Sequence, residues 1–152
     1  MRLTGLHLLI TYRCTYACDH CFVWGSPDLQ ETMTVEQLGI AIDQAAELGT
    51  VDMVYFEGGE PTLAYPILLE AAARVRSHGL EVGLVTNCFW ATSPEDAELW
   101  LRPFAALGIS DLSLSSYPYS GEKGLPPIRL RNALQAARRL RLPGEVLRVG
   151  AG

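Results

Sequence analysis

The order of elements in this sequence predicts an α/β protein built on a parallel sheet. Five short runs have the composition of strands: Leu6–Tyr12, Asp52–Glu57, Glu81–Asn87, Ile109–Ser116 and Glu145–Val149. Four longer runs between them have helical periodicity: Val35–Leu48, Pro66–His78, Pro94–Leu107 and Ile128–Leu140. Because strands alternate with helices, we expect right-handed βαβ crossovers, which place the strands parallel to one another.

Capping residues support the helix boundaries. Thr34 and Gln37 have the spacing of a capping box, and Ser93 stands before a proline and two acidic residues. A left-handed residue is expected where a glycine follows a helix, at Gly49, Gly79 and Gly108. Pro103 lies inside the third helical run, and we expect it to kink or split that helix.

Composition excludes several classes of protein. The 152 residues are 49% hydrophobic, which is typical of one globular domain with a sizeable core. The net charge of -5 argues against a broad nucleic-acid surface. The sequence has no apolar run long enough to cross a membrane and no signal-peptide core at its start. We therefore expect a cytoplasmic protein in a reducing compartment, with neither nucleic acid nor membrane as a partner.

Three cysteines crowd one loop directly after the first strand. Cys14, Cys18 and Cys21 have the spacing C-x3-C-x2-C. Three thiolates can hold three irons of a cubane cluster, and because full protein ligation takes four, one iron would stay open to a ligand. The alternative is a zinc site with His20 or His7 as fourth ligand. Zinc sites usually add a second ligand pair far along the chain, whereas Cys88 stands alone.

A second motif, Glu57-Gly58-Gly59-Glu60-Pro61, follows the second strand. Glycines at that point allow the backbone to approach another group closely, because they carry no Cβ. Taken alone, the same residues would also suit an ordinary turn between a strand and a helix.

The two motifs, in this order and each after a predicted strand, resemble the signatures of the radical S-adenosylmethionine (radical SAM) superfamily. The resemblance implies a partial parallel (β/α) barrel with a [4Fe-4S] cluster on Cys14, Cys18 and Cys21. It implies an enzyme that binds S-adenosylmethionine (SAM) at the open iron and cleaves it reductively to a 5′-deoxyadenosyl radical for hydrogen abstraction. The substrate, a small molecule or a peptide, is unknown. An external electron donor of the flavodoxin or ferredoxin type is implied as well.

The same resemblance assigns further residues to SAM, although it names no catalytic side chain. Gly58, Gly59 and Glu60 would hold the methionine moiety, and His20 would lie against the adenine. Asn87, Ser113 and Ser115 are candidates for the nucleoside end. The alternatives are that His20 shapes the loop and that the serines only end their strand. Cys88 stands where relatives often carry glycine; it could be a fourth ligand or a pocket thiol, although a lone cysteine is more often a small buried hydrophobe.

The family fold usually has six βα units, whereas this chain stops after a fifth strand. We therefore expect residues 1–152 to form one core domain that is incomplete at its C-terminal end. An uncovered parallel edge predicts self-association. Two other functions remain open: a truncated, non-catalytic protein that binds cluster and SAM, and a structural α/β domain stabilised by zinc.

Overall fold

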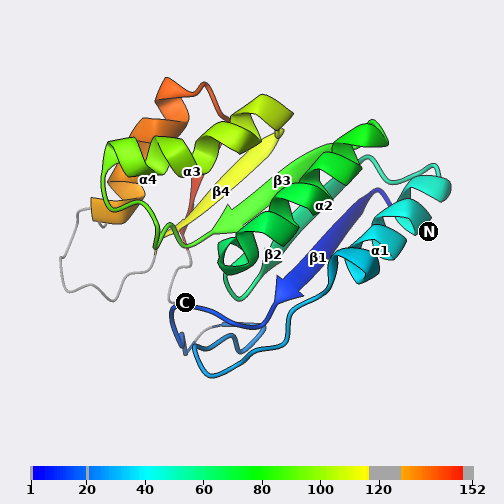
Figure 1. The fold of residues 1–152 in the computed structure, drawn as a ribbon, viewed down its shortest axis with the longest axis horizontal. Coiled ribbons are helices and arrows are strands. Elements are labelled where there is room, and N and C mark those ends of the chain that lie inside the picture. Colours follow the sequence, from blue (N-terminus) through cyan, green and yellow to red (C-terminus); the bar gives the residue numbers. More distant parts are fainter. Residues whose placement is uncertain (1, 20, 117–127, 149–152) are drawn as a thin grey trace. The chain divides into compact units, whose positions relative to one another are not determined.

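A computed structural model of the chain describes residues 2–19, 21–116 and 128–148. The described residues form five strands and four α-helices in the alternating order that the sequence predicts (Figure 1). The strands are β1 (Gly5–Thr11), β2 (Met53–Gly58), β3 (Glu81–Thr86), β4 (Asp111–Ser116) and β5 (Gly144–Arg148). The helices are α1 (Val35–Glu47), α2 (Tyr65–Ser77), α3 (Pro94–Leu107) and α4 (Ile128–Arg139), with a short 3₁₀ helix, η1 (Pro61–Ala64). The predicted α/β class is confirmed.

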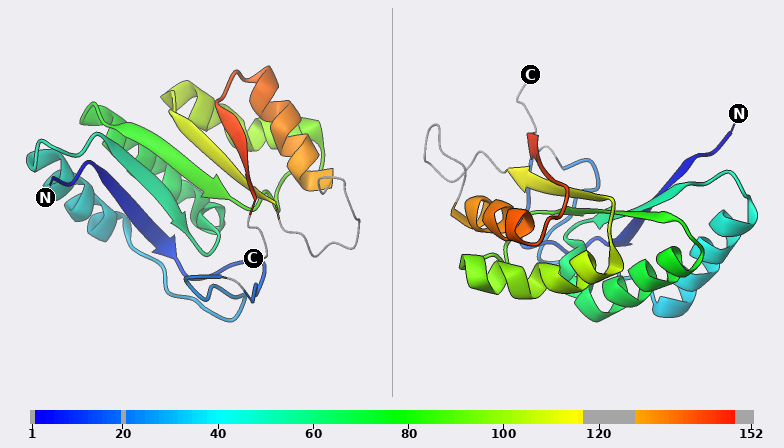
Figure 2. Two further views of the ribbon diagram at one scale, coloured as in Figure 1. Left: turned by 180° about the vertical axis from the view of Figure 1, so that it is seen from behind. Right: turned by 90° about the horizontal axis from the view of Figure 1, so that it is seen from above.

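The chain divides into two compact units, Met1–Leu84 and Val85–Gly152. In the first unit β1 pairs with β2 and β2 with β3, all in parallel, and the register aligns Leu8, Phe56 and Leu84 across the three strands. These three side chains are buried, as are Ile10 and Val54. Figure 2 shows α1 and α2 along one side of these strands. The core of the first unit lies between that side and the two helices.

The second unit is built from β4, β5, α3 and α4. The parallel register of β4 and β5 pairs Ser113 with Glu145 and Ser115 with Leu147. Leu112 and Leu114 are fully buried on the alternate face of β4. Asn132 of α4 donates hydrogen bonds from its side chain to the carbonyls of Ala91 and Thr92, at 3.0 and 3.1 Å, and so ties α4 to the segment before α3.

The predicted capping residues are where the sequence places them. The Thr34 hydroxyl accepts from the Gln37 amide at 3.2 Å, and the Gln37 side chain accepts from the Thr34 amide at 2.9 Å. Ser93 caps α3 by accepting from the Asp96 amide at 3.0 Å. The left-handed glycines are confirmed, with φ of 63° at Gly49, 76° at Gly79 and 66° at Gly108.

Pro103 does not split its helix, because α3 is continuous from Pro94 to Leu107. A proline removes the amide that would donate to the carbonyl four residues earlier, here that of Leu99. Leu99 is 60% exposed, so this turn of α3 lies on the solvent side of the helix. The other predicted bounds agree with the structure to within two residues, and Val149 lies outside the described residues.

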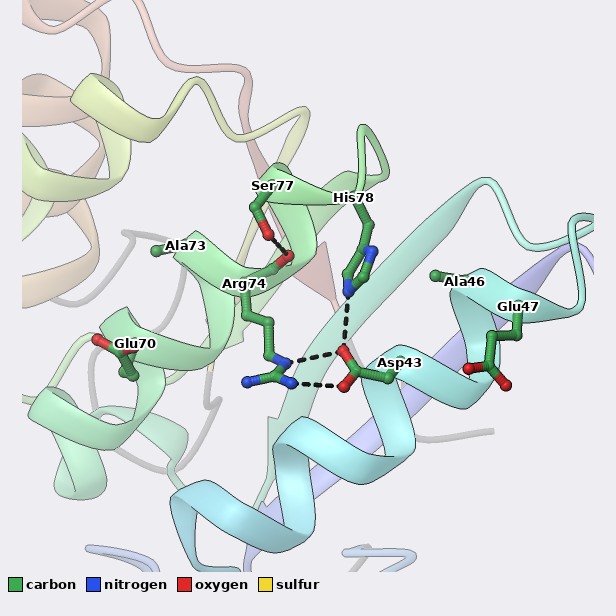
Figure 3. Close-up of a pocket in the computed structure, with 8 residues that line it drawn as sticks. All are labelled: Asp43, Ala46, Glu47, Glu70, Ala73, Arg74, Ser77 and His78. Atoms are coloured by element: carbon green, nitrogen blue, oxygen red, sulfur yellow. Dashed lines mark hydrogen bonds and ion pairs between the residues drawn. The ribbon is translucent and has the colours of Figure 1, made fainter.

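A cluster of charged side chains connects α1 to α2 (Figure 3). Asp43 of α1 accepts from Arg74 of α2, with Nε at 2.8 Å from Oδ1 and Nη2 in contact with Oδ2, and from Nε2 of His78 at 2.8 Å. Arg74 and then His78 lower the pKa of Asp43 below its usual value. The groove around this cluster, about 870 Å³, contains none of the residues that the sequence analysis assigns to a site.

The side of β1–β3 away from the helices has a row of closely packed residues. The His7 ring stacks on the Tyr55 ring with centroids 4.8 Å apart and planes at 13°. A Cβ on Gly83 would lie 2.3 Å from Cδ1 and Cε1 of Tyr55. Because the register pairs His7 with Tyr55 and Tyr55 with Gly83, the three form one row across the strands.

We expect Asp43→Asn to lower the melting temperature at pH 7, because Arg74 and His78 lose an anionic acceptor. A carboxyl with a depressed folded-state pKa stabilises the fold above its unfolded pKa of about 3.9, and this contribution is lost as the pH falls further. The difference between wild type and variant should therefore shrink below that pH, as measured by thermal unfolding monitored by circular dichroism. A difference that stays constant from pH 7 to pH 3 would contradict an electrostatic origin.

We expect Gly83→Ala to destabilise the fold by about 1–3 kcal/mol, the usual cost of overpacking, since the new methyl group would displace the Tyr55 ring. Urea unfolding measures the free energy. Gly5→Ala is the matched control, because a Cβ there would meet no atom closer than the Met53 carbonyl oxygen at 3.9 Å. Equal stability of the two variants would show that Tyr55 can move without cost.

Candidate functional site

The loop that carries the three cysteines begins where β1 ends and is held by backbone hydrogen bonds. The Cys14 amide donates to the Ser26 carbonyl at 3.0 Å, and the Ser26 amide donates to the Tyr12 carbonyl at 3.3 Å. Within the loop, the Cys21 amide donates to the Cys18 carbonyl at 3.0 Å. Cys14, Cys18 and Cys21 are in no disulfide, and all three are partly exposed. All three are therefore available as ligands from one short segment.

The chemistry of these donors fits an iron–sulfur cluster. Burial raises the pKa of the Cys14 thiol; a backbone hydrogen bond from Tyr16 lowers it, and the charges of Glu60 and Cys18 add to the rise. A thiolate in this position needs a nearby cation, which a cluster supplies. The Gly25 amide lies 3.4 Å from Sγ of Cys21 and donates to it. Hydrogen bonds to the sulfurs are among the features that set the potential of such clusters.

The described residues do not distinguish the cluster from the zinc alternative. Among them, no group of three or more histidine, cysteine, aspartate or glutamate side chains is arranged to hold a metal ion. His20, one of the two histidines considered as a fourth ligand, lies outside the described residues. The other, His7, is paired with Glu57. Three cysteines on a cluster bind three separate irons, so their thiols need not converge on one point.

The Gly58–Glu60 segment lies directly against the backbone that precedes Cys14. The Gly59 amide donates to the Thr11 carbonyl at 2.7 Å, and the Glu60 amide donates to the Arg13 carbonyl at 2.8 Å. A Cβ on Gly59 would lie 2.3 Å from the Arg13 carbonyl oxygen. Gly58 has a φ of 131°, which strains any residue with a Cβ. The two motifs of the sequence therefore meet in space.

This contact gives the glycines a role that the sequence analysis missed. The sequence suggested that Gly58 and Gly59 leave room for a cofactor, whereas here they leave room for the start of the cysteine loop. Gly25, from the far end of that loop, also approaches: a Cβ on it would lie 3.1 Å from Cα of Gly59. One sequence alone contains no signal for such a contact, because the residues involved are more than thirty positions apart.

Glu60 has a structural role within its own turn. Its side chain is fully buried, and Oε1 accepts from the Thr62 amide at 3.2 Å and from the Thr62 hydroxyl at 2.6 Å. Glu60 is thereby the N-cap of η1. The carboxylate fixes the turn that follows the two glycines, and a contact with SAM stays a prediction.

In the second unit, Asn87 and Cys88 follow β3 and lead into a turn, which the Ala91 amide closes by donating to the Cys88 carbonyl at 3.0 Å. Cys88 has a φ of 61°, the left-handed conformation that glycine adopts most easily, and its side chain is fully buried. Its amide donates to the Thr86 hydroxyl at 3.2 Å, and the Asn87 side-chain oxygen accepts from the Phe89 amide at 3.1 Å. The geometry agrees with Cys88 as a small buried hydrophobe in a place suited to glycine.

The two serines of β4 share one face, as the alternation with Leu112 and Leu114 predicts. Ser113 is 5% exposed and lies 3.2 Å from the Asp111 carboxylate, to which its hydroxyl donates. Ser115 is partly exposed. Their assignment to the nucleoside of SAM stays a prediction.

Sequence reasoning left Glu57 without a role and considered His7 only as a zinc ligand. Nδ1 of His7 lies 2.7 Å from Oε1 of Glu57. The alternation of the two strands puts both side chains on the side opposite Leu8 and Phe56. Only the β1–β2 register brings them together, and register cannot be read from a single sequence.

Comparison with known proteins matches the radical SAM superfamily model to residues 8–146. The chain is 34% identical over 110 residues to the S-adenosylmethionine-dependent nucleotide dehydratase of Selenomonas ruminantium, covering 69% of this chain and 38% of that protein. It is 32% identical over 105 residues to the tungsten-containing aldehyde ferredoxin oxidoreductase cofactor-modifying protein of Pyrococcus furiosus. That match covers 68% of this chain and 28% of the Pyrococcus protein. The chain thus spans little more than a third of these relatives at most.

Solved structures share the fold. BtrN in complex with AdoMet and 2-DOIA superposes with a TM-score of 0.69 at 14% identity, covering 97% of this chain and 57% of that one. Native anSMEcpe with bound AdoMet superposes with a TM-score of 0.64 at 18% identity, covering 95% of this chain and 43% of that one.

Within the described residues, no helix is both long and apolar enough to cross a membrane. The family match covers most of the sequence, both motifs included, and the fold agrees with it: this chain belongs to the radical SAM superfamily.

Proposed function

We propose that this protein binds a [4Fe-4S] cluster through Cys14, Cys18 and Cys21 and cleaves SAM reductively to start hydrogen abstraction from a substrate. The main support is the direct backbone contact between the cysteine loop and the Gly58–Glu60 segment. Two motifs that the family uses for cluster and cofactor come from different parts of the sequence and meet at the ends of β1 and β2. A purely structural domain would not need three cysteines at that junction.

The residues of the chain would share the work as follows. The three thiolates hold the cluster, which supplies the electron for cleavage when it is bound. The segment Gly58–Glu60 presents backbone groups to the methionine end of SAM, in a turn that Thr62 stabilises through Glu60. Asn87, Ser113, Ser115 and His20 are proposed contacts for the nucleoside end. The protein thus orients the cofactor and limits access of water, while the cofactor does the radical chemistry.

The substrate, a small molecule or a peptide, cannot be taken over from the relatives, because this chain matches only part of each. The name of the Selenomonas ruminantium protein states that it acts on a nucleotide, and this describes that protein alone. Electron supply from a flavodoxin- or ferredoxin-like donor is part of the proposal. So is a cytoplasmic location, since a reducing compartment keeps cluster thiols unoxidised.

Anaerobic reconstitution should give a brown protein with about four irons per chain, as expected of a cubane cluster. Replacing Cys14, Cys18 or Cys21 by alanine should abolish iron binding, whereas Cys88→Ala, the control, should retain it because that thiol is buried away from solvent. Iron, zinc and acid-labile sulfide are measured by chemical analysis. Stoichiometric zinc without sulfide would refute the cluster. If the cluster assembles but no 5′-deoxyadenosine forms when SAM and dithionite are added, the protein binds the cluster without catalysing SAM cleavage.

Gly59→Ala should lower both iron content and SAM affinity, because the new methyl group would push away the Arg13 carbonyl, which is adjacent to Cys14. Iron analysis and isothermal titration with SAM measure the two effects, and Gly5→Ala again provides the control. If SAM affinity falls while iron content is unchanged, the glycine serves the cofactor directly and the loop contact is dispensable.

A further inference from the structure

The His7–Glu57 pair has no role in holding the cluster, and its position is suited to a ligand. Its side chains are 58% and 18% exposed, respectively. Figure 2 shows α1 and α2 on one side of β1–β3, and strand alternation puts the pair on the other side. Glu57 also precedes Gly59 by two residues, about 7 Å along a strand. The pair thus lies on the side of β1–β3 opposite α1 and α2. It is close in sequence to the Gly58–Glu60 segment, which is proposed to hold the methionine end of SAM.

The hydrogen bond to Glu57 defines what His7 can offer to a ligand. Nδ1 of His7 is engaged by Oε1 of Glu57, so Nε2 is the ring nitrogen left for another group. In the tautomer with the proton on Nδ1, Nε2 accepts a hydrogen bond. The ring is also held in place by stacking on Tyr55, whose own position depends on the absence of a side chain at Gly83. The hydrogen bond and the stacking thus orient the His7 ring, and with it the position of Nε2.

Charge narrows the class of ligand further. None of β1, β2 and β3 contains a lysine or an arginine, while Glu57 and Glu81 supply carboxylates. A phosphate or carboxylate beside Glu57 would be repelled, and no cation of these strands would compensate. A hydroxyl or an amine can donate to Nε2, and an ammonium group gains attraction from the carboxylate as well.

From these observations we propose that His7, held by Glu57 and Tyr55, contacts a hydroxyl or amino group of the substrate. This inference rests on the proposed function, since it takes the side of the sheet without helices to be the substrate side. His7 is the contact residue, and Glu57 and Tyr55 position it. The proposal gives the unknown substrate a chemical class, that of a neutral or cationic hydrogen-bond donor.

The test uses saturation-transfer NMR on the reconstituted protein with SAM, titrated with four small probes. Ethanol and ethylamine are expected to bind, whereas acetate and methyl phosphate are not. His7→Gln and Glu57→Gln should weaken binding of ethylamine about tenfold, the effect of losing a hydrogen bond to a charged group. His78→Gln is the matched control, because His78 also pairs with a carboxylate but belongs to the α1–α2 groove. Thermal unfolding shows that each variant is folded, and Tyr55→Phe provides a milder change of the same site.

Two results would overturn the inference. One is that no probe binds, or that acetate and methyl phosphate bind as well as ethylamine. The other is that the His7 and Glu57 variants bind the probes as His78→Gln does. Isothermal titration of the wild type with SAM is done first and separates the two proposals. Absence of SAM binding contradicts the proposed function, whereas SAM binding without probe binding contradicts only the assignment of His7.

Discussion

The candidate site depends on one contact, that between the end of β2 and the end of β1. At Gly58–Glu60 the chain comes so close to Thr11 and Arg13 that two amide-to-carbonyl hydrogen bonds form and no Cβ fits between. The cysteine loop leaves β1 at this point, so its origin is fixed by backbone rather than by side chains. Cys14 gains a defined position even before any metal binds, and Gly25 brings the returning end of the loop to the same place.

The rest of the first unit serves to align these two strand ends. Leu8, Ile10, Val54 and Phe56 are buried, which fixes the β1–β2 register from the helix side. A slip by one residue would turn these side chains outward, so the register is strongly determined. Asp43 with Arg74 and His78 then joins the two helices that cover that side. Packing of the core thus fixes the β1–β2 register, and the register aligns the two motifs at the ends of these strands.

Much of the fold could be predicted from sequence, because local signals were strong. The capping box at Thr34 and Gln37, the serine cap at Ser93 and the three left-handed glycines each mark a helix end through chemistry that acts within a few residues. Pro103 was expected to kink or split α3, and it does not split the helix. How a helix accommodates an internal proline depends on its surroundings in the folded protein, which the local sequence does not contain.

The cysteine spacing and the Gly-Gly-Glu-Pro segment pointed to the family, and the family match confirms that membership. What sequence could not show is what depends on register and on long-range approach. The reason for Gly59 lies in Arg13, and the partner of Glu57 is His7, fifty positions away. The left-handed backbone conformation of Cys88 likewise becomes visible only in the structure.

The contact between the strand ends also has a consequence for biosynthesis. A ribosome makes the chain from its N-terminus, so the three cysteines emerge some forty residues before Gly59 and Glu60. Until β2 has been made and paired, the acceptor carbonyls of Thr11 and Arg13 have no partners, and the cysteine loop has no fixed origin. Metal loading onto the nascent chain would therefore meet three reactive thiols on a loose segment. Cluster delivery therefore suits a chain in which Gly59 and Glu60 have emerged from the ribosome and β1 has paired with β2.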